Sequence, residues 1–95
     1  MTLESDEVQR ACRVQGRVQG VGFRWWTRET ARSLGLAGTV RNLPDGSVEV
    51  HARGPADGVA ELGKRLRDGP AFARVDRVEA RASRVPLGPG FEVTR

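Results

Sequence analysis

Residues 16–24 combine the residue types that bind a phosphate group at the start of a helix. Gly16, Gly20 and Gly22 punctuate this run, and glycine permits the tight turn that points successive backbone N–H groups into one concavity. Arg24 follows at once, and its planar guanidinium suits two parallel hydrogen bonds to phosphate oxygens. The free N–H groups of a helix that begins here add partial positive charge. The run therefore predicts a phosphate site.

The same run differs from the common nucleotide-binding loops. It lacks the Gly-Lys-Ser/Thr end of a Walker loop, and Trp25 stands where the Gly-x-Gly-x-x-Gly pattern has its third glycine. Nucleotide binding is therefore disfavoured.

Two other polar side chains have open roles. Asn42 lies beyond the loop, and its carbonyl can accept a hydrogen bond from a water molecule while its amide donates one. An asparagine near a turn also bonds to the local backbone, so Asn42 has a structural alternative. Arg17 either attracts anions to the loop or is a solvated strand residue.

The remaining reactive residue types are predicted to be structural. His51, the only histidine, alternates with apolar neighbours, so we expect it on the outward face of a strand and not as a general base. Cys12 alternates inward with Val14, which predicts a buried small apolar residue and not a nucleophile. Trp25 falls on the charged side of the expected helix, where it either shields the rim of the phosphate site or packs on arginine stems.

The elements that position these residues follow from hydrophobic periodicity. Alternation and turn signals predict strands over residues 12–18, 38–43, 47–53, 77–82 and 91–93, and helical periodicity predicts helices over residues 23–34 and 55–68. Pro44-Asp45-Gly46 predicts a hairpin. Val75 is out of phase with the fourth strand, which places it near the strand's entry or at a bulge.

This order predicts an α+β fold, the ferredoxin-like βαββαβ sandwich, with a mostly antiparallel sheet, two helices on one face and a short extra C-terminal strand. Residues 1–10 show no periodicity and are expected to form a flexible leader before one domain over residues 11–95. The fold alone does not define a function, because enzymes, ligand sensors and RNA binders share it.

Composition indicates which kinds of partner and which cellular compartment to expect. The chain has 16 basic and 12 acidic residues among 95, a net charge of +4, which favours anionic partners. One cysteine excludes an intrachain disulfide, as in a reducing compartment. The acidic start is unlike a signal peptide, and no apolar run approaches the ~20 residues that span a bilayer. We expect a cytoplasmic protein that does not bind membranes.

Residues 16–24 and Gly38-Thr39-Val40-Arg41-Asn42, whose asparagine follows Arg24 by about eighteen residues, together closely resemble the acylphosphatase family. The similarity continues through residues 45–49, 69–70, 73–78 and 90–93, and so covers nearly everything after Ala11. The paired motifs are specific together, whereas either alone is weak.

The resemblance implies a hydrolase that splits acyl phosphates into a carboxylate and inorganic phosphate without a metal or other cofactor. It implies that the phosphate lies in the loop formed by Gln19, Gly20, Val21, Gly22 and Phe23, that Arg24 and Asn42 are catalytic, and that inorganic phosphate or sulfate binds as a product-like ligand. We expect a monomer.

The chemistry agrees with this assignment. A carboxylate whose conjugate acid has a pKa of about 4 leaves without a proton from the enzyme, so no general acid is needed. Backbone amides and Arg24 can stabilise the charge on the equatorial oxygens of a loose transition state.

The alternative function is a non-catalytic ferredoxin-like module that binds phosphate or RNA. RNA-binding domains of this fold stack bases on aromatic residues of the sheet. The chain has no tyrosine, and its third and fourth expected strands carry no aromatic residue, so we expect no nucleic-acid partner.

Overall fold

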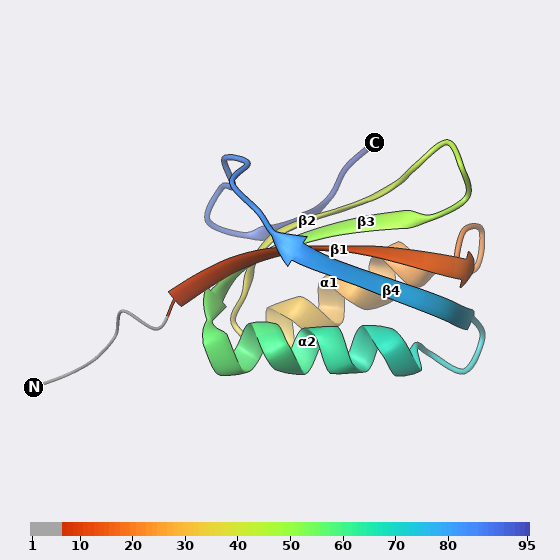
Figure 1. Cartoon of the computed structure of the whole chain (residues 1–95), viewed down its shortest axis with the longest axis horizontal. Helices are drawn as coiled ribbons and strands as arrows, with labels where there is room; N and C mark the ends of the chain where they lie inside the picture. The colour runs from red at the N-terminus through yellow and green to blue at the C-terminus, as the bar shows by residue number, and fades with distance from the viewer. Residues whose placement is uncertain (1–6) are drawn as a thin grey trace, which may run out of the picture.

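A computed structural model describes residues 7–95, which form a single sheet covered by two helices (Figure 1). In chain order the elements are β1 (Glu7–Arg17), α1 (Phe23–Ser33), β2 (Ala37–Asn42), β3 (Val48–Pro55), α2 (Ala56–Asp68), β4 (Arg74–Ala82) and β5 (Phe91–Val93). This is the predicted βαββαβ order with its extra C-terminal strand.

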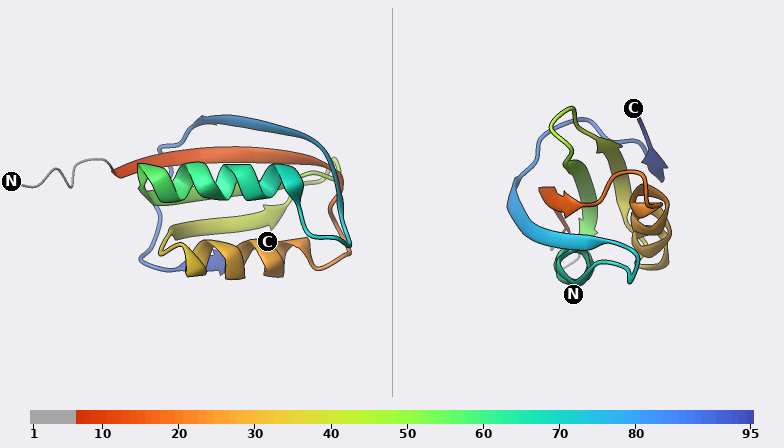
Figure 2. Two further views of the ribbon diagram at one scale, coloured as in Figure 1. Left: turned by 90° about the horizontal axis from the view of Figure 1, so that it is seen from below. Right: turned by 90° about the vertical axis from the view of Figure 1, so that its right-hand side faces the viewer.

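The five strands in the described part of the chain lie in the order β4-β1-β3-β2-β5. All neighbouring pairs are antiparallel except β2 and β5, which run parallel. Both helices cover the same face of the sheet (Figure 2). The predicted ferredoxin-like sandwich is confirmed.

The core lies between the sheet and the helices. Its buried side chains come from alternate positions of the strands and from the inner sides of α1 and α2: Val14, Phe23, Ala31, Val40, Val48, Val50, Val59, Leu62, Leu66 and Phe91. The predicted strand alternation and the three-four spacing on α2 account for most of this set.

Strand β1 begins earlier than its periodicity predicted. Glu7 pairs with Pro55 and Arg10 with Ala52, so Glu7 to Arg10 belong to the sheet and not to a leader. Backbone hydrogen bonding to β3 extends the strand where the side-chain pattern gives no signal. The rest of the expected leader, residues 1–6, lies outside the described residues.

Strand β4 also begins before residue 77, and it contains the suspected irregularity. Gln15 faces Arg77 whereas Gly16 faces Val75, so Asp76 is the extra residue of a bulge. Gly16 has φ 137°, and a Cβ there would lie 2.1 Å from the carbonyl oxygen of Arg74. The bulge explains why Val75 is out of phase, and it requires glycine on the facing strand.

His51 lies on the outer face of β3, as predicted, but it is buried, with 7% of its surface exposed. Its Nδ1 lies 2.7 Å from the hydroxyl of Ser83, and its Nε2 lies 3.5 Å from a Glu49 carboxylate oxygen. The segment after β4 crosses this face, where the side-chain amide of Gln9 donates to the carbonyl of Val85 at 2.7 Å. These contacts give His51 a structural environment away from the helices.

Candidate active site

The loop between β1 and α1 turns sharply at two glycines. Gly20 has φ 75° and Gly22 has φ 82°, both in the left-handed region that other residues rarely adopt. Gly22 is the N-cap of α1 and provides no side-chain cap, and its carbonyl accepts the Trp26 N–H at 3.0 Å. The earlier N–H groups of the helix therefore have no partner within it.

This helix end is electropositive. The first turn of α1, which lies wholly within the described residues, has no acidic side chain. Free N–H groups and the helix dipole therefore act without a carboxylate to neutralise them. Such an end is suited to an anion.

A hollow of about 350 Å³ lies beside this helix end, and we call it the loop pocket. Its lining residues are Val18, Gly20, Gly22, Phe23, Arg24, Trp25, Arg28 and Val93. They come from the loop that follows β1, the first turns of α1 and strand β5. The loop pocket therefore joins the glycine turn to the C-terminal strand.

Arg24 is the guanidinium in this pocket that remains free to bind a ligand. It is half-buried, and among residues 7–95 it forms no ion pair or side-chain hydrogen bond. Arg28, one turn later, instead contacts Glu29, with 3.1 Å between its Nε and the carboxylate. The two arginines are therefore not equivalent.

The side chain of Gln19 ties the loop to the neighbouring hairpin. Its Nε2 donates to the carbonyl of Leu43 and to the carbonyl of Ser47, both at 2.8 Å. Leu43 also donates its backbone N–H to Ser47 at 2.8 Å, so one side chain links the loop to the ends of β2 and β3. Sequence reasoning assigned Gln19 to the phosphate loop but did not foresee this brace.

Asn42 ends β2 directly beside the carbonyl that Gln19 holds. It shares a face with Val40, which is fully buried against the helices, so its side chain lies on the inner side of the sheet. Its Oδ1 is buried and has no hydrogen-bond partner among the described residues. A buried, unpaired amide oxygen is costly, and a water or ligand would satisfy it.

The predicted site residues divide into two groups. Gly20, Gly22, Phe23 and Arg24 line the loop pocket, whereas Gln19, Val21 and Asn42 do not. Arg17 is exposed and also lies outside the lining.

The loop pocket also contains residues that the sequence did not assign to it. Arg28 lies one turn after Arg24, and this spacing of four puts both arginines on one side of α1. Val93 reaches the pocket because β5 pairs with β2, where Val93 faces Val40. No local sequence signal reveals that long-range pairing.

The β2–β3 hairpin beside Asn42 is held by charge. Asp45 accepts the backbone N–H of Ser47 at 2.9 Å and the Ser47 hydroxyl, and it forms an ion pair with Arg13. The hydrogen bonds from Ser47, together with that from Arg13, lower the pKa of Asp45 to about 2. The carboxylate therefore stays ionised near neutral pH and fixes the turn.

Residues 7–95 contain no cluster of three or more histidine, cysteine, aspartate or glutamate side chains that could hold a metal ion. Within the same residues, neither helix has the length and apolar character needed to cross a membrane.

Comparison with known proteins gives a consistent result. The family model described as acylphosphatase matches residues 10–93. An acylphosphatase of Nitrobacter hamburgensis is 58% identical over 74 residues, covering 78% of this chain and 75% of the relative, and one of Rhizorhabdus wittichii is 48% identical over 86 residues, covering 90% and 87%. The solved structure of an acylphosphatase from Coxiella burnetii is 37% identical, with a TM-score of 0.90 over 99% of this chain and 100% of that one.

Proposed function

This chain belongs to the acylphosphatase family, and from that premise we propose that the loop pocket is where it hydrolyses acyl phosphates to a carboxylate and inorganic phosphate. The observation that carries the proposal is the free guanidinium of Arg24 beside the unpaired N–H groups at the start of α1. Together they form a site for a dianionic phosphoryl group.

The phosphoryl group binds to the loop backbone and to Arg24. We assign this contact to backbone N–H groups of the loop, of which those of Gly20, Gly22 and Phe23 belong to residues that line the pocket. The side-chain nitrogen of Gln19 is already engaged by the hairpin. Arg24 adds two parallel donors to the equatorial oxygens, where charge gathers in a loose transition state.

The acyl group leaves as a carboxylate. Its conjugate acid has a pKa of about 4, so it departs without a proton, and no general acid is required of this site. Positioning and charge stabilisation are then the main tasks of the protein. In this proposal the backbone N–H groups and Arg24 perform both tasks, and no metal ion takes part.

Asn42 orients the attacking water. The support for this role is its buried, unpaired Oδ1 on the inner face of β2, next to the carbonyl that Gln19 binds. The oxygen accepts a hydrogen bond from water. The proton released on attack passes to the bound phosphate, which is itself a base.

The acyl part of the substrate contacts an apolar rim. Three of the four exposed large hydrophobic side chains among the described residues gather here: Trp25 and Val93 line the loop pocket, and a Cβ at Gly22 would lie 3.8 Å from the ring of Phe72. Apolar surface left exposed beside a polar site commonly marks a ligand contact. The rim favours acyl phosphates with an apolar or aromatic acyl group.

We further propose that the protein is a cytoplasmic monomer and that inorganic phosphate or sulfate binds in the loop pocket as a product-like ligand. Its net charge of +4 favours the approach of such anions.

The test is phosphate release from acetyl phosphate by the purified protein in excess chelator. Turnover is expected, while an alkyl phosphate monoester should not react, because its alkoxide leaving group needs a proton that the site does not provide. A metal requirement, or equal turnover of both compounds, would contradict the mechanism. Phosphate binding with no turnover of either would favour a non-catalytic module.

A further inference from the structure

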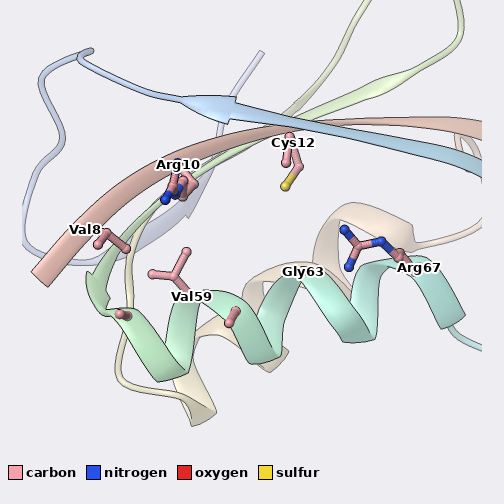
Figure 3. A pocket seen from close by; sticks show the side chains of 9 residues that line it. Val8, Arg10, Cys12, Val59, Gly63 and Arg67 are labelled. Atoms are coloured by element: carbon pink, nitrogen blue, oxygen red, sulfur yellow. The ribbon is translucent and has the colours of Figure 1, made fainter. Parts of the chain in front are cut away.

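A second hollow lies away from the loop pocket, between helix α2 and strands β1 and β4 (Figure 3). We call it the α2 pocket. It has a volume of about 400 Å³ and is lined by Val8, Arg10, Cys12, Ala56, Val59, Ala60, Gly63, Arg67 and Ala80. This volume falls in the range of about 300–1,000 Å³ that is typical of small-molecule sites.

The α2 pocket exists because the residues of α2 that face it are small. Ala56, Ala60 and Gly63 leave space beside Val59, whereas Leu62 and Leu66 on the same helix fill the core. A Cβ placed on Gly63 would meet only the Nη1 of Arg67, at 3.9 Å. The space is therefore open enough to receive an apolar chain.

The charge around this pocket has one sign. Arg10 and Arg67 line it, no acidic residue does, and within residues 7–95 neither arginine forms an ion pair or a side-chain hydrogen bond. In the view of Figure 3 the two guanidinium groups lie to either side of Cys12. An apolar hollow with unneutralised cations at its walls is complementary to an anion that carries an apolar part.

Cys12 contributes to the apolar wall. Burial raises the pKa of its thiol above the ordinary value, and the charges of Arg67 and Arg81 oppose this shift. A neutral thiol is a small, polarisable apolar group. In Figure 3 the side chain of Arg67 extends from α2 toward the middle of the pocket.

We propose that the α2 pocket binds a small amphipathic carboxylate, with its head on the guanidinium of Arg67 and its apolar chain along Cys12, Val59 and Val8. The planar fork of arginine matches a carboxylate with two parallel hydrogen bonds. The site is separate from the loop pocket, and the proposal does not depend on the hydrolytic reaction.

The test titrates the protein with octanoate, below its micelle concentration, and follows backbone amide NMR shifts. Acetate has the head without the chain, and octanol has the chain without the head. We expect octanoate to shift the amides of Val8, Gly63 and Arg67, and each control to bind about tenfold more weakly or worse, as the loss of a charge-assisted hydrogen bond or of apolar burial requires. Equal binding of all three probes, or shifts confined to residues 20–25, would overturn the proposal.

Two variants and a matched control identify the pocket. Gly63→Leu fills the hollow at a helical position that favours leucine over glycine, so the fold should persist while octanoate binding is lost. Arg67→Gln should weaken octanoate binding about tenfold. Lys64→Gln removes the same charge from α2 at a residue that does not line the pocket, and it should leave octanoate binding unchanged.

A third readout uses the thiol. At an octanoate concentration near the wild-type Kd, octanoate should slow alkylation of Cys12 in the wild type and in Lys64→Gln, and much less in Arg67→Gln. Wild-type affinity in Gly63→Leu, or an equal loss in the two charge variants, would show that the binding is non-specific attraction and overturn the proposal.

Discussion

At the scale of single residues, the loop pocket contains two arginines with different partners. Arg28 is paired with Glu29, whereas Arg24 has no charged partner in the described chain. Arg24→Lys keeps the charge but loses the fork, so kcat/KM for acetyl phosphate should fall by about 100-fold or more. Arg65→Lys makes the same change at an exposed residue of α2 and should leave kcat/KM unchanged. Activity within a few-fold of wild type in Arg24→Lys would remove this residue from the reaction.

Asn42 should act on kcat. Its Oδ1 is buried and unpaired, so the proposed water contact is made in the reaction and adds little to phosphate binding. Asn42→Ala should lower kcat by about 100-fold with KM and phosphate affinity nearly unchanged, the pattern of an interaction realised mainly in the transition state.

A circular-dichroism melt is the control for Asn42→Ala, because removing a half-buried side chain at the end of a strand can itself lower the stability of the fold. Near-full kcat, or activity lost only in proportion to the unfolded fraction, would make Asn42 a structural residue.

Trp25 should determine which acyl groups are preferred. It lines the loop pocket with 61% of its surface exposed, so it has apolar area to offer a substrate. Trp25→Ala should reduce the preference for an aromatic acyl phosphate over acetyl phosphate by roughly tenfold, which corresponds to about 1.4 kcal/mol of lost ring contact. Val85→Ala, at an exposed apolar residue outside the loop pocket, is the control. An unchanged ratio of kcat/KM values in Trp25→Ala would place the acyl group elsewhere.

Residue types and local spacing predicted the part of the site that is contiguous in the chain. Gly20, Gly22 and Arg24 line one pocket because a turn and a helix start bring neighbours together. Val93 and the bonds from Gln19 depend on pairing between distant segments, which no local pattern reports. The role of Trp25 stayed open because helical periodicity gives the side of the helix on which a residue lies but not which residues lie next to it.

At the scale of elements, β2 and β3 place Asn42, and their hairpin depends on an ionised Asp45. Its pKa is about 2 when folded, below the ordinary 3.8, so its carboxylate stabilises the folded state above pH 3.8, and this contribution is lost as pH falls toward 2. Asp45→Asn should therefore be less stable than wild type at pH 5, and the difference should narrow as pH falls from 3.8 to 2.

Urea unfolding at several pH values measures this effect. The carboxylate is substantially exposed, so the difference should be small and should shrink further in high salt. A stability gap that is constant from pH 5 to pH 2 would mean that the asparagine acts through packing and not through charge.

The elements themselves were largely predictable, and their boundaries less so. Alternation located β3 and the three-four spacing located α2, because in both the apolar side faces one core. The start of β1 was missed, because Glu7 to Arg10 are held by backbone pairing with β3 while their side chains show no pattern. A bulge was foreseeable from Val75, but its register depends on the contact between Gly16 and Arg74.

At the scale of the whole molecule, both pockets lie on the helix-bearing side of the sheet but at different elements. The loop pocket is formed around α1 and β5, and the α2 pocket lies between α2, β1 and β4. Sheet order explains the separation, since β1 and β4 occupy the opposite edge from β2 and β5. The fold therefore keeps the free Arg24 apart from Arg10 and Arg67, so the two proposed anion sites share no cation.

Phosphate binding to the loop pocket should stabilise the whole fold, because the site joins the loop after β1 to α1 and β5 and does not exist in the unfolded chain. At 100 times its Kd, inorganic phosphate should add about 2.7 kcal/mol. For a domain of this size, this corresponds to a rise in Tm of roughly 10–20 °C.

The same ligand, inorganic phosphate, should inhibit hydrolysis competitively, with an inhibition constant equal to the Kd obtained from the Tm series. Arg24→Lys should lose most of the shift and Arg65→Lys should retain it, which separates a specific site from general attraction to a chain of charge +4. Non-competitive inhibition, or an equal Tm shift in both variants, would place the phosphate outside the loop pocket.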